Sequence, residues 1–192
     1  GGIIITASHN PKEYNGYKAY WNDGAQVVAP HDKNIIAEVQ KITSPDQVLT
    51  NGHKDNIVIL DETFDAIYLD AVHSLSLSPE AIAAHHDLKI VYTPIHGTGV
   101  ILVPESLRKF GFTNVVTVKE QNIPDGNFPT VASPNPEERA TMKMAIDLAA
   151  RQQAEIVLAT DPDADRIGMA LRDRDGSYIL LNGNQTCAPL VY

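Results

Sequence analysis

The apolar residues in the first half of the chain recur at two spacings, which predict a small sheet followed by helices. Residues 3–5 are a continuous isoleucine run, typical of a buried strand. Residues 17–21 and 25–28 predict two more strands of a meander, because turn-forming pairs of asparagine, aspartate and glycine separate these segments. Apolar residues at three- and four-residue spacing predict amphipathic helices over residues 31–42 and 64–75.

The second half alternates apolar runs with amphipathic stretches, which is the order of a βαβ arrangement. The expected strands are, in chain order, residues 89–92, 115–118, 155–160, 167–171 and 178–181. Val103, Leu107 and Phe110 mark the buried side of a helix between the first two strands, and Gly111 is expected to end it. The pattern predicts an α/β fold with a largely parallel sheet and helices on both faces.

A second helix of this half follows a polar, proline-rich stretch, residues 119–135, which we expect to be a surface loop. Asn135 is the predicted cap and Pro136 the first helical residue, because an asparagine side chain accepts from free amides and proline lacks an amide hydrogen. The buried face of this helix is expected to contain Met142, Ala145, Ile146 and Ala149. The break in periodicity between Ser74 and Pro79 predicts two domains, residues 1–76 and 77–192.

Composition narrows the possible partners. The 192 residues are 43% hydrophobic and carry a formal net charge of −9, so the chain can form a core and shows no basic face for nucleic acid or an anionic membrane. The single cysteine cannot form an internal disulfide, which favours a cytoplasmic location. No apolar run is long enough to predict a membrane span.

Three aspartates alternate directly after the expected strand 155–160. The segment reads Asp161-Pro162-Asp163-Ala164-Asp165-Arg166. Alternate side chains of an extended segment point the same way, so the three carboxylates would repel each other unless a cation lay between them. Such oxygen ligands suit Mg²⁺ or Ca²⁺. A calcium EF-hand is excluded because Arg166 and Arg172 occupy the positions that require glycine and glutamate. The remaining alternative is a solvated acidic turn.

A second candidate loop follows the first strand and reads Thr6-Ala7-Ser8-His9-Asn10-Pro11. We interpret Ser8 as a phosphoryl acceptor, because lysines 12 and 18 lie nearby in sequence and a phosphate oxygen could complete the aspartates' metal site. The alternative is that Ser8 and Asn10 only cap a turn. A Ser–His–Asp hydrolase is disfavoured, because adjacent side chains of extended chain point to opposite sides. His9 and His96 remain ambiguous between scaffold and substrate contact.

The serine loop, with its continuation Tyr14-Asn15-Gly16-Tyr17-Lys18, resembles the phosphoserine loop of the α-D-phosphohexomutases, the superfamily that includes phosphoglucomutase and phosphomannomutase. The aspartate segment resembles the metal loop of that family, with proline and alanine where many members have glycine. The segment 20–26 and the turn 96–99 look most like the phosphoglucomutase and phosphopentomutase branch. The resemblance implies two mixed-sheet α/β sandwich domains, the first of them incomplete.

The resemblance also implies a reaction and roles for individual residues. Phosphoserine 8 would give its phosphoryl group to a hexose monophosphate, and a hexose 1,6-bisphosphate would return the other phosphate to Ser8. The family's Mg²⁺ ligands match Ser8, Asp161, Asp163 and Asp165. The residues that match its catalytic and phosphate-binding positions are His9, Asn10, Lys18 and Arg166.

The resemblance covers only part of the family's length. The start of its first domain and its third and fourth domains, which read the sugar and hold the second phosphate, have no counterpart here. We therefore expect a fragment with little mutase activity on its own, and the sequence does not select among glucose, mannose, glucosamine and pentose phosphates or an oligomeric state. The alternative function is a non-catalytic module that binds metal or phosphate.

Overall fold

The structure is a computed structural model that describes residues 1–191, and the side chains of residues 1–188. It divides into two compact units, which we describe separately. Unit 1 comprises residues 1–6 and 15–62, and unit 2 comprises residues 7–14 and the described residues from 63 onward. The serine loop thus belongs to unit 2, although the strands that flank it belong to unit 1. The division predicted at residue 76 remains a prediction.

Unit 1 contains a two-stranded antiparallel sheet and one helix. Strand β1 (Gly2–Ile5) pairs with β2 (Tyr17–Tyr20), so that Ile4 lies opposite Lys18. Helix α1 (His31–Val39) confirms the first predicted helix, and single 3₁₀ turns follow at Pro45–Gln47 and Lys54–Asn56. The predicted strand 25–28 was wrong, because only an isolated bridge between Tyr20 and Gln26 forms there.

The isoleucine run of β1 is exposed, which corrects the expectation of a buried strand. Ile3 is 61% exposed and Ile5 is 79% exposed. The cause is that the described part of unit 1 holds only two paired strands, and a two-stranded sheet has too little apolar area to bury both of its faces.

Unit 2 is built on a five-stranded sheet with the order β4-β3-β5-β6-β7. Its strands are β3 (Ile90–Thr93), β4 (Val115–Thr117), β5 (Ile156–Thr160), β6 (Ile167–Arg172) and β7 (Tyr178–Leu181). Strand β3 runs parallel to β4 and β5, whereas β6 is antiparallel to both β5 and β7. The sheet is therefore mixed rather than largely parallel, because short connections join β5, β6 and β7 and short connections force neighbouring strands to run antiparallel.

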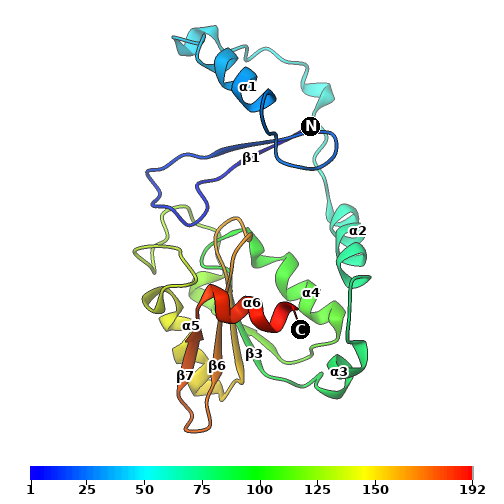
Figure 1. Ribbon diagram of the computed structural model, residues 1–192, viewed down its shortest axis with the longest axis vertical. Helices are drawn as coiled ribbons and strands as arrows, with labels where there is room; N and C mark the ends of the chain where they lie inside the picture. Colours follow the sequence, from blue (N-terminus) through cyan, green and yellow to red (C-terminus); the bar gives the residue numbers. More distant parts are fainter. Residues whose placement is uncertain (192) are drawn as a thin grey trace. The chain divides into compact units, whose positions relative to one another are not determined.

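Helices cover both faces of this sheet (Figure 1). Helix α5 (Arg139–Gln152) packs on β3 and β5, α4 (Leu102–Phe110) on β4, and α6 (Gly183–Val191) on β6 and β7. The other helices are α2 (Glu62–His73) and α3 (Pro79–Ala84). Met142 and Ala145 of α5 are fully buried in one core with Val157 of β5. Leu158 points to the opposite face, where it lines a cavity together with Val103 and Leu107 of α4. No described helix is long and apolar enough to cross a membrane.

The ends of two predicted helices can be compared with the structure. Gly111 ends α4 in a left-handed conformation with φ 110°, as predicted. The predicted start of α5 was wrong, because the Asn135 side chain accepts from the Glu137 amide in a separate turn and the helix begins only at Arg139. The preceding loop is not wholly at the surface either, since Gln121 is fully buried.

Candidate metal and phosphoryl site

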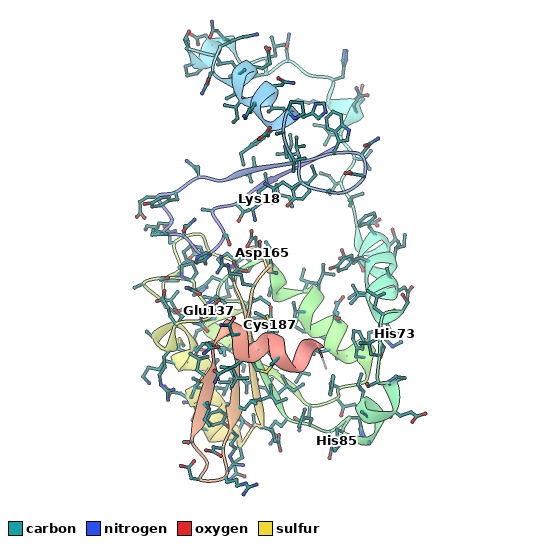
Figure 2. All side chains as sticks on the ribbon, viewed as in Figure 1. Lys18, His73, His85, Glu137, Asp165 and Cys187 are labelled. Carbon is teal, nitrogen blue, oxygen red and sulfur yellow. The ribbon has the colours of Figure 1, made fainter. Side chains whose placement is uncertain are left out.

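The aspartate loop begins where β5 ends, and the turn after β3 lies beside it. Because β3 and β5 are parallel neighbours, their carboxyl ends meet at the same edge of the sheet. Figure 2 shows Asp165 at this edge, between the end of β5 and the start of β6. The fold thus presents the loop's side chains at the position where open α/β sheets bind ligands.

The three aspartates that the sequence singled out form one cluster. Carboxylate oxygens of Asp161, Asp163 and Asp165 all lie within 4.8 Å of one another. Asp161 is buried, Asp163 is half-buried and Asp165 is exposed, so the cluster runs from the sheet edge to the surface. A graded set of hard oxygen donors with an open side fits Mg²⁺, which keeps water or phosphate oxygens among its ligands.

The electrostatics of Asp161 favour a neighbouring cation. Burial raises the pKa of this carboxyl, and the nearby Asp163 raises it further. Hydrogen bonds from the Ser8 hydroxyl and the Arg166 amide act in the opposite direction but do not cancel the effect of burial on the pKa. A buried carboxylate with a second carboxylate beside it is stabilised either by a proton or by a cation.

Ser8 lies against this cluster, 153 residues away in sequence. Its Oγ donates a hydrogen bond of 2.7 Å to Oδ2 of Asp161. The backbone of Ser8 is in the left-handed region, with φ 54°, which is uncommon for a residue that carries a side chain. Such strained conformations persist where the surroundings hold them, and they are frequent at functional sites.

His9 also contacts Ser8, which corrects the expectation that the two adjacent side chains point apart. Nδ1 of His9 lies 3.3 Å from Oγ of Ser8. The expectation failed because Ser8 is left-handed rather than extended. With the single hydroxyl hydrogen of Ser8 directed to Asp161, a hydrogen bond in this contact requires the tautomer of His9 that carries a hydrogen on Nδ1. In this arrangement His9 does not act as a base toward Ser8. A Ser–His–Asp hydrolase therefore remains disfavoured, because of the hydrogen-bond arrangement rather than because the two side chains point apart.

The other candidate residues take different positions. Asn10 is exposed, and its amide closes a turn by donating to the carbonyl of Ala7. Lys12, in the same loop, donates to Oδ1 of Asn127 at 3.4 Å. Lys18 is a half-buried residue of β2 in unit 1.

Arg166 serves the loop mainly through its backbone. Its amide donates to Oδ1 of Asp161 at 3.0 Å, which ties the end of the aspartate segment to its start. Its guanidinium lies 3.9 Å from Oε1 of Glu137, and both side chains are more than 40% exposed. So long and exposed an ion pair holds the side chain weakly, which leaves the guanidinium able to bind an anion.

His96, which the sequence left ambiguous, has a scaffold role. It is buried, and its Nδ1 lies 2.9 Å from the carbonyl oxygen of Ile123. That carbonyl can only accept, so Nδ1 carries the hydrogen and Nε2 accepts from Thr130 at 2.8 Å. Gln121 extends the network by donating to Thr130 and accepting from Thr93. The imidazole therefore fastens the loop 119–135 to the end of β3.

Sequence reasoning missed the residues that support the two loops. Gln121, Asn127 and Thr130 looked like ordinary polar residues of a long loop, and no spacing marks them. Gly97 and Thr98 were noted only as part of a turn, although both contact the backbone of Pro162. The one available signal was the position of that turn, directly after an expected strand.

Comparisons with known proteins agree on one family. Residues 1–46 match the family described as phosphoglucomutase/phosphomannomutase, alpha/beta/alpha domain I, and residues 66–176 match alpha/beta/alpha domain II. A relative named as a probable phosphomannomutase from Haemophilus influenzae is 41% identical over 95% of the chain. A phosphoglucomutase from Staphylococcus aureus is 37% identical over 99% of the chain.

A solved structure shows a similar fold, and the relatives are longer than this chain. A phosphoglucomutase/phosphomannomutase family protein from Burkholderia thailandensis superposes with a TM-score of 0.64 over 92% of the chain, at 24% identity. The chain spans 34% of the length of that protein, 37% of the Haemophilus relative and 34% of the Staphylococcus relative.

Proposed function

Because the chain belongs to the phosphoglucomutase/phosphomannomutase family, we propose that it carries the phosphoryl-accepting serine and the metal loop of a phosphohexomutase. The whole enzyme would be an isomerase that moves phosphate between O1 and O6 of a hexose. Its partner would be a small sugar phosphate rather than nucleic acid or a membrane. One observation carries this proposal: the Ser8 hydroxyl lies 2.7 Å from Oδ2 of Asp161, which belongs to the cluster of three carboxylates.

The proposed reaction has two balanced phosphoryl transfers. In the first, a hydroxyl oxygen of the sugar phosphate bonds to the phosphorus on Ser8, and the bond between phosphorus and Oγ breaks. The proton of the sugar hydroxyl passes to a base, and Oγ takes up a proton to become the serine hydroxyl. The product is a hexose 1,6-bisphosphate. In the second transfer, Oγ of Ser8 attacks the other phosphorus of the turned sugar and gives its hydrogen to a base. The bond between that phosphorus and the sugar oxygen breaks, and the sugar oxygen takes up a proton. Lys18 is the family's candidate for proton transfer, and Arg166 and Asn10 are candidates for holding phosphate.

The donor set of the loop fits Mg²⁺. Asp161, Asp163 and Asp165 would hold the ion, with an oxygen on Ser8 as a further ligand, because their oxygens are already gathered within a few ångströms. When bound, the ion neutralises charge on the transferring phosphoryl group. The residues themselves perform the remaining tasks: in the unphosphorylated form, Asp161 orients Oγ of Ser8 by accepting its hydrogen, and His9 lies 3.3 Å from the same oxygen.

This proposal does not specify which sugar phosphate is the substrate. Relatives of similar identity are named for mannose and for glucose phosphates, so the names do not separate the two. Hexose phosphate is the substrate class that both names share.

A phosphoryl-transfer assay on Ser8 tests the proposal without requiring the full mutase cycle. The chain is incubated with Mg²⁺ and glucose 1,6-bisphosphate labelled on phosphorus, and the label on the protein is counted and located by peptide mass spectrometry. We expect one labelled site, Ser8, and loss of the label in Ser8→Ala and in Asp163→Asn. Removal of Mg²⁺ with a chelator should abolish labelling as well.

Ser133 provides a matched control, because its hydroxyl also donates to a carboxylate, Oε1 of Glu138, at 3.0 Å. Ser133→Ala should label like the original chain. Labelling that survives Ser8→Ala would contradict the proposed acceptor. A chain that binds Mg²⁺ through the three aspartates and never accepts the label would instead support a non-catalytic metal-binding module.

A further inference from the structure

The turn after β3 is tied to the aspartate loop through one carbonyl group. The amide of Thr98 donates to the carbonyl oxygen of Pro162 at 2.9 Å, and the Thr98 hydroxyl donates to the same oxygen at 3.1 Å. Pro162 stands between Asp161 and Asp163, and its carbonyl belongs to the peptide group that leads into Asp163. Two donors on this oxygen fix the plane of that peptide group, and with it the direction in which the Asp163 side chain leaves the backbone.

The turn can approach so closely because residue 97 is glycine. A Cβ atom added to Gly97 would lie 2.4 Å from Cα of Pro162 and 2.7 Å from its oxygen, which is far inside van der Waals contact. The next glycine fits a second tight place, since a Cβ on Gly99 would lie 2.4 Å from the Tyr92 hydroxyl and 2.8 Å from Oγ1 of Thr160. The two glycines therefore let the backbone of the turn approach the backbone of Pro162 and the side-chain hydroxyls of Tyr92 and Thr160.

The aspartate loop needs such an external support. Asp161, Asp163 and Asp165 carry like charges at short range, and mutual repulsion would spread a loop that is free to move. The backbone of Ala164 is a second unfavourable feature of the loop. Its φ of 59° lies in the left-handed region, which disfavours a residue with a Cβ. Within the loop, the amides of Ala164 and Arg166 both donate to Asp161, but neither bond involves the carbonyl oxygen of Pro162.

We infer that Thr98 is a positioning residue for the metal site: its paired donors to Pro162 hold Asp163 in the geometry that binds a divalent cation. This inference rests on the proposed function, because it assumes that the three carboxylates bind a metal. Thr98 contributes no carboxylate to the cluster, and its amide and hydroxyl both donate to the carbonyl oxygen of Pro162.

Binding of Mn²⁺, a magnetic stand-in for Mg²⁺, tests the inference on the full chain. Free Mn²⁺ is measured by electron paramagnetic resonance during titration of the original chain, Thr98→Val and Thr98→Ser. Valine keeps the shape of threonine and removes the hydroxyl donor, whereas serine keeps the donor. We expect the dissociation constant of Thr98→Val to rise by about tenfold, the low end for loss of a residue that orients a ligand. Thr98→Ser should stay close to the original chain.

Thr113 is a matched control for a purely structural effect. Its amide and hydroxyl both donate to the carbonyl of His86, at 2.9 and 3.2 Å, so the motif is the same but lies away from the aspartates. Thr113→Val and Thr98→Val should lower the unfolding midpoint by similar small amounts, while only Thr98→Val weakens Mn²⁺ binding.

The positioning role of Thr98 and the metal site on which it rests can be tested separately. Unchanged Mn²⁺ binding in Thr98→Val, together with loss of binding in Asp163→Asn, would overturn the positioning role and leave the metal site standing. Equal weakening in Thr98→Val and Thr113→Val would overturn it too, because the effect would then be one of general stability. Absence of Mn²⁺ binding in the original chain would refute the metal site itself, and the positioning role would fall with it.

Discussion

The two units of this chain use similar apolar sequences with opposite results. In unit 1 the isoleucines of β1 stay exposed, with Ile5 at 79%. In unit 2 the apolar residues of β3 are buried, since Val91 is fully buried and Ile90 is 2% exposed. The difference lies in what surrounds the strands, because β3 has strand neighbours on both sides and lies in a sheet with helices on both of its faces, whereas β1 pairs with β2 alone.

The contrast shows that an isoleucine run specifies a strand but not its burial. Burial requires a layer on each face, and only unit 2 supplies both within the described residues. The serine loop of the candidate site is connected to strands of unit 1 but belongs to unit 2. Unit 2 therefore holds both the serine and the three aspartates of the proposed chemistry.

The largest expected difference between the two units is in the free energy of unfolding after a side chain is shortened to alanine. Met142 is fully buried in the core of unit 2, so Met142→Ala should lower the free energy of unfolding by about 2–5 kcal/mol. Ile5→Ala in unit 1 should change it by no more than about 0.5 kcal/mol, since the side chain already meets water. Urea denaturation of the two variants measures both values. Similar losses in the two variants would show that unit 1 has a core of its own.

Two glycine substitutions give a smaller contrast of the same kind. A Cβ on Gly168 would lie 2.3 Å from the carbonyl oxygen of Pro136, so Gly168→Ala should destabilise unit 2 by about 1–3 kcal/mol through overpacking. A Cβ on Gly52 in unit 1 meets nothing within 4 Å, and Gly52→Ala should be neutral or slightly stabilising. Thermal unfolding of both variants provides the measurement. A neutral Gly168→Ala would mean that β6 can move away from Pro136 at little cost.

The smallest expected contrast comes from alkaline pH, which acts on buried tyrosine hydroxyls of unit 2, chiefly that of Tyr92. Burial raises the pKa of Tyr92 to about 12, against 10.0 for an ordinary tyrosine. The unfolded chain therefore loses its proton first, and the stability from Tyr92 is complete below about pH 10 and is lost as the pH rises toward 12.

Tyr92→Phe removes this ionisation and should flatten the alkaline fall in unfolding free energy, measured by urea denaturation at a series of pH values. Burial also raises the pKa of Tyr178, so a residual slope is expected in the variant. A slope unchanged by Tyr92→Phe would contradict the assignment of the effect to Tyr92.

Much of the architecture could be predicted because the deciding signals are local. The apolar runs located all five strands of the unit 2 sheet, and Gly111 marked the end of α4 correctly because a left-handed cap favours glycine. The start of α5 was misjudged because Asn135 caps a turn as readily as a helix. The antiparallel direction of β6 depends on connection length, which the alternating pattern alone does not reveal.

The residues of the candidate site could be selected from their types, but their arrangement in space could not be predicted. Residue types located the serine and the aspartates, since phosphoryl acceptors and metal ligands are few in kind. The left-handed turn at Ser8 could not be foreseen, because nothing in serine favours φ 54° and the surroundings impose it. For the same reason the contact between Ser8 and His9 was missed, and the support from Thr98 depends on a parallel neighbour that only the folded sheet brings close.

The close approach of Gly97 to Pro162 has a consequence for the evolution of this region. The atoms that a side chain at position 97 would strike are the Cα, carbonyl carbon and oxygen of residue 162, which every amino acid possesses. Position 162 can therefore exchange proline for glycine without relaxing the demand on position 97. Such a contact leaves no correlated substitutions between the two positions, so we expect methods that infer proximity from covarying residues to overlook one of the tightest contacts beside the site.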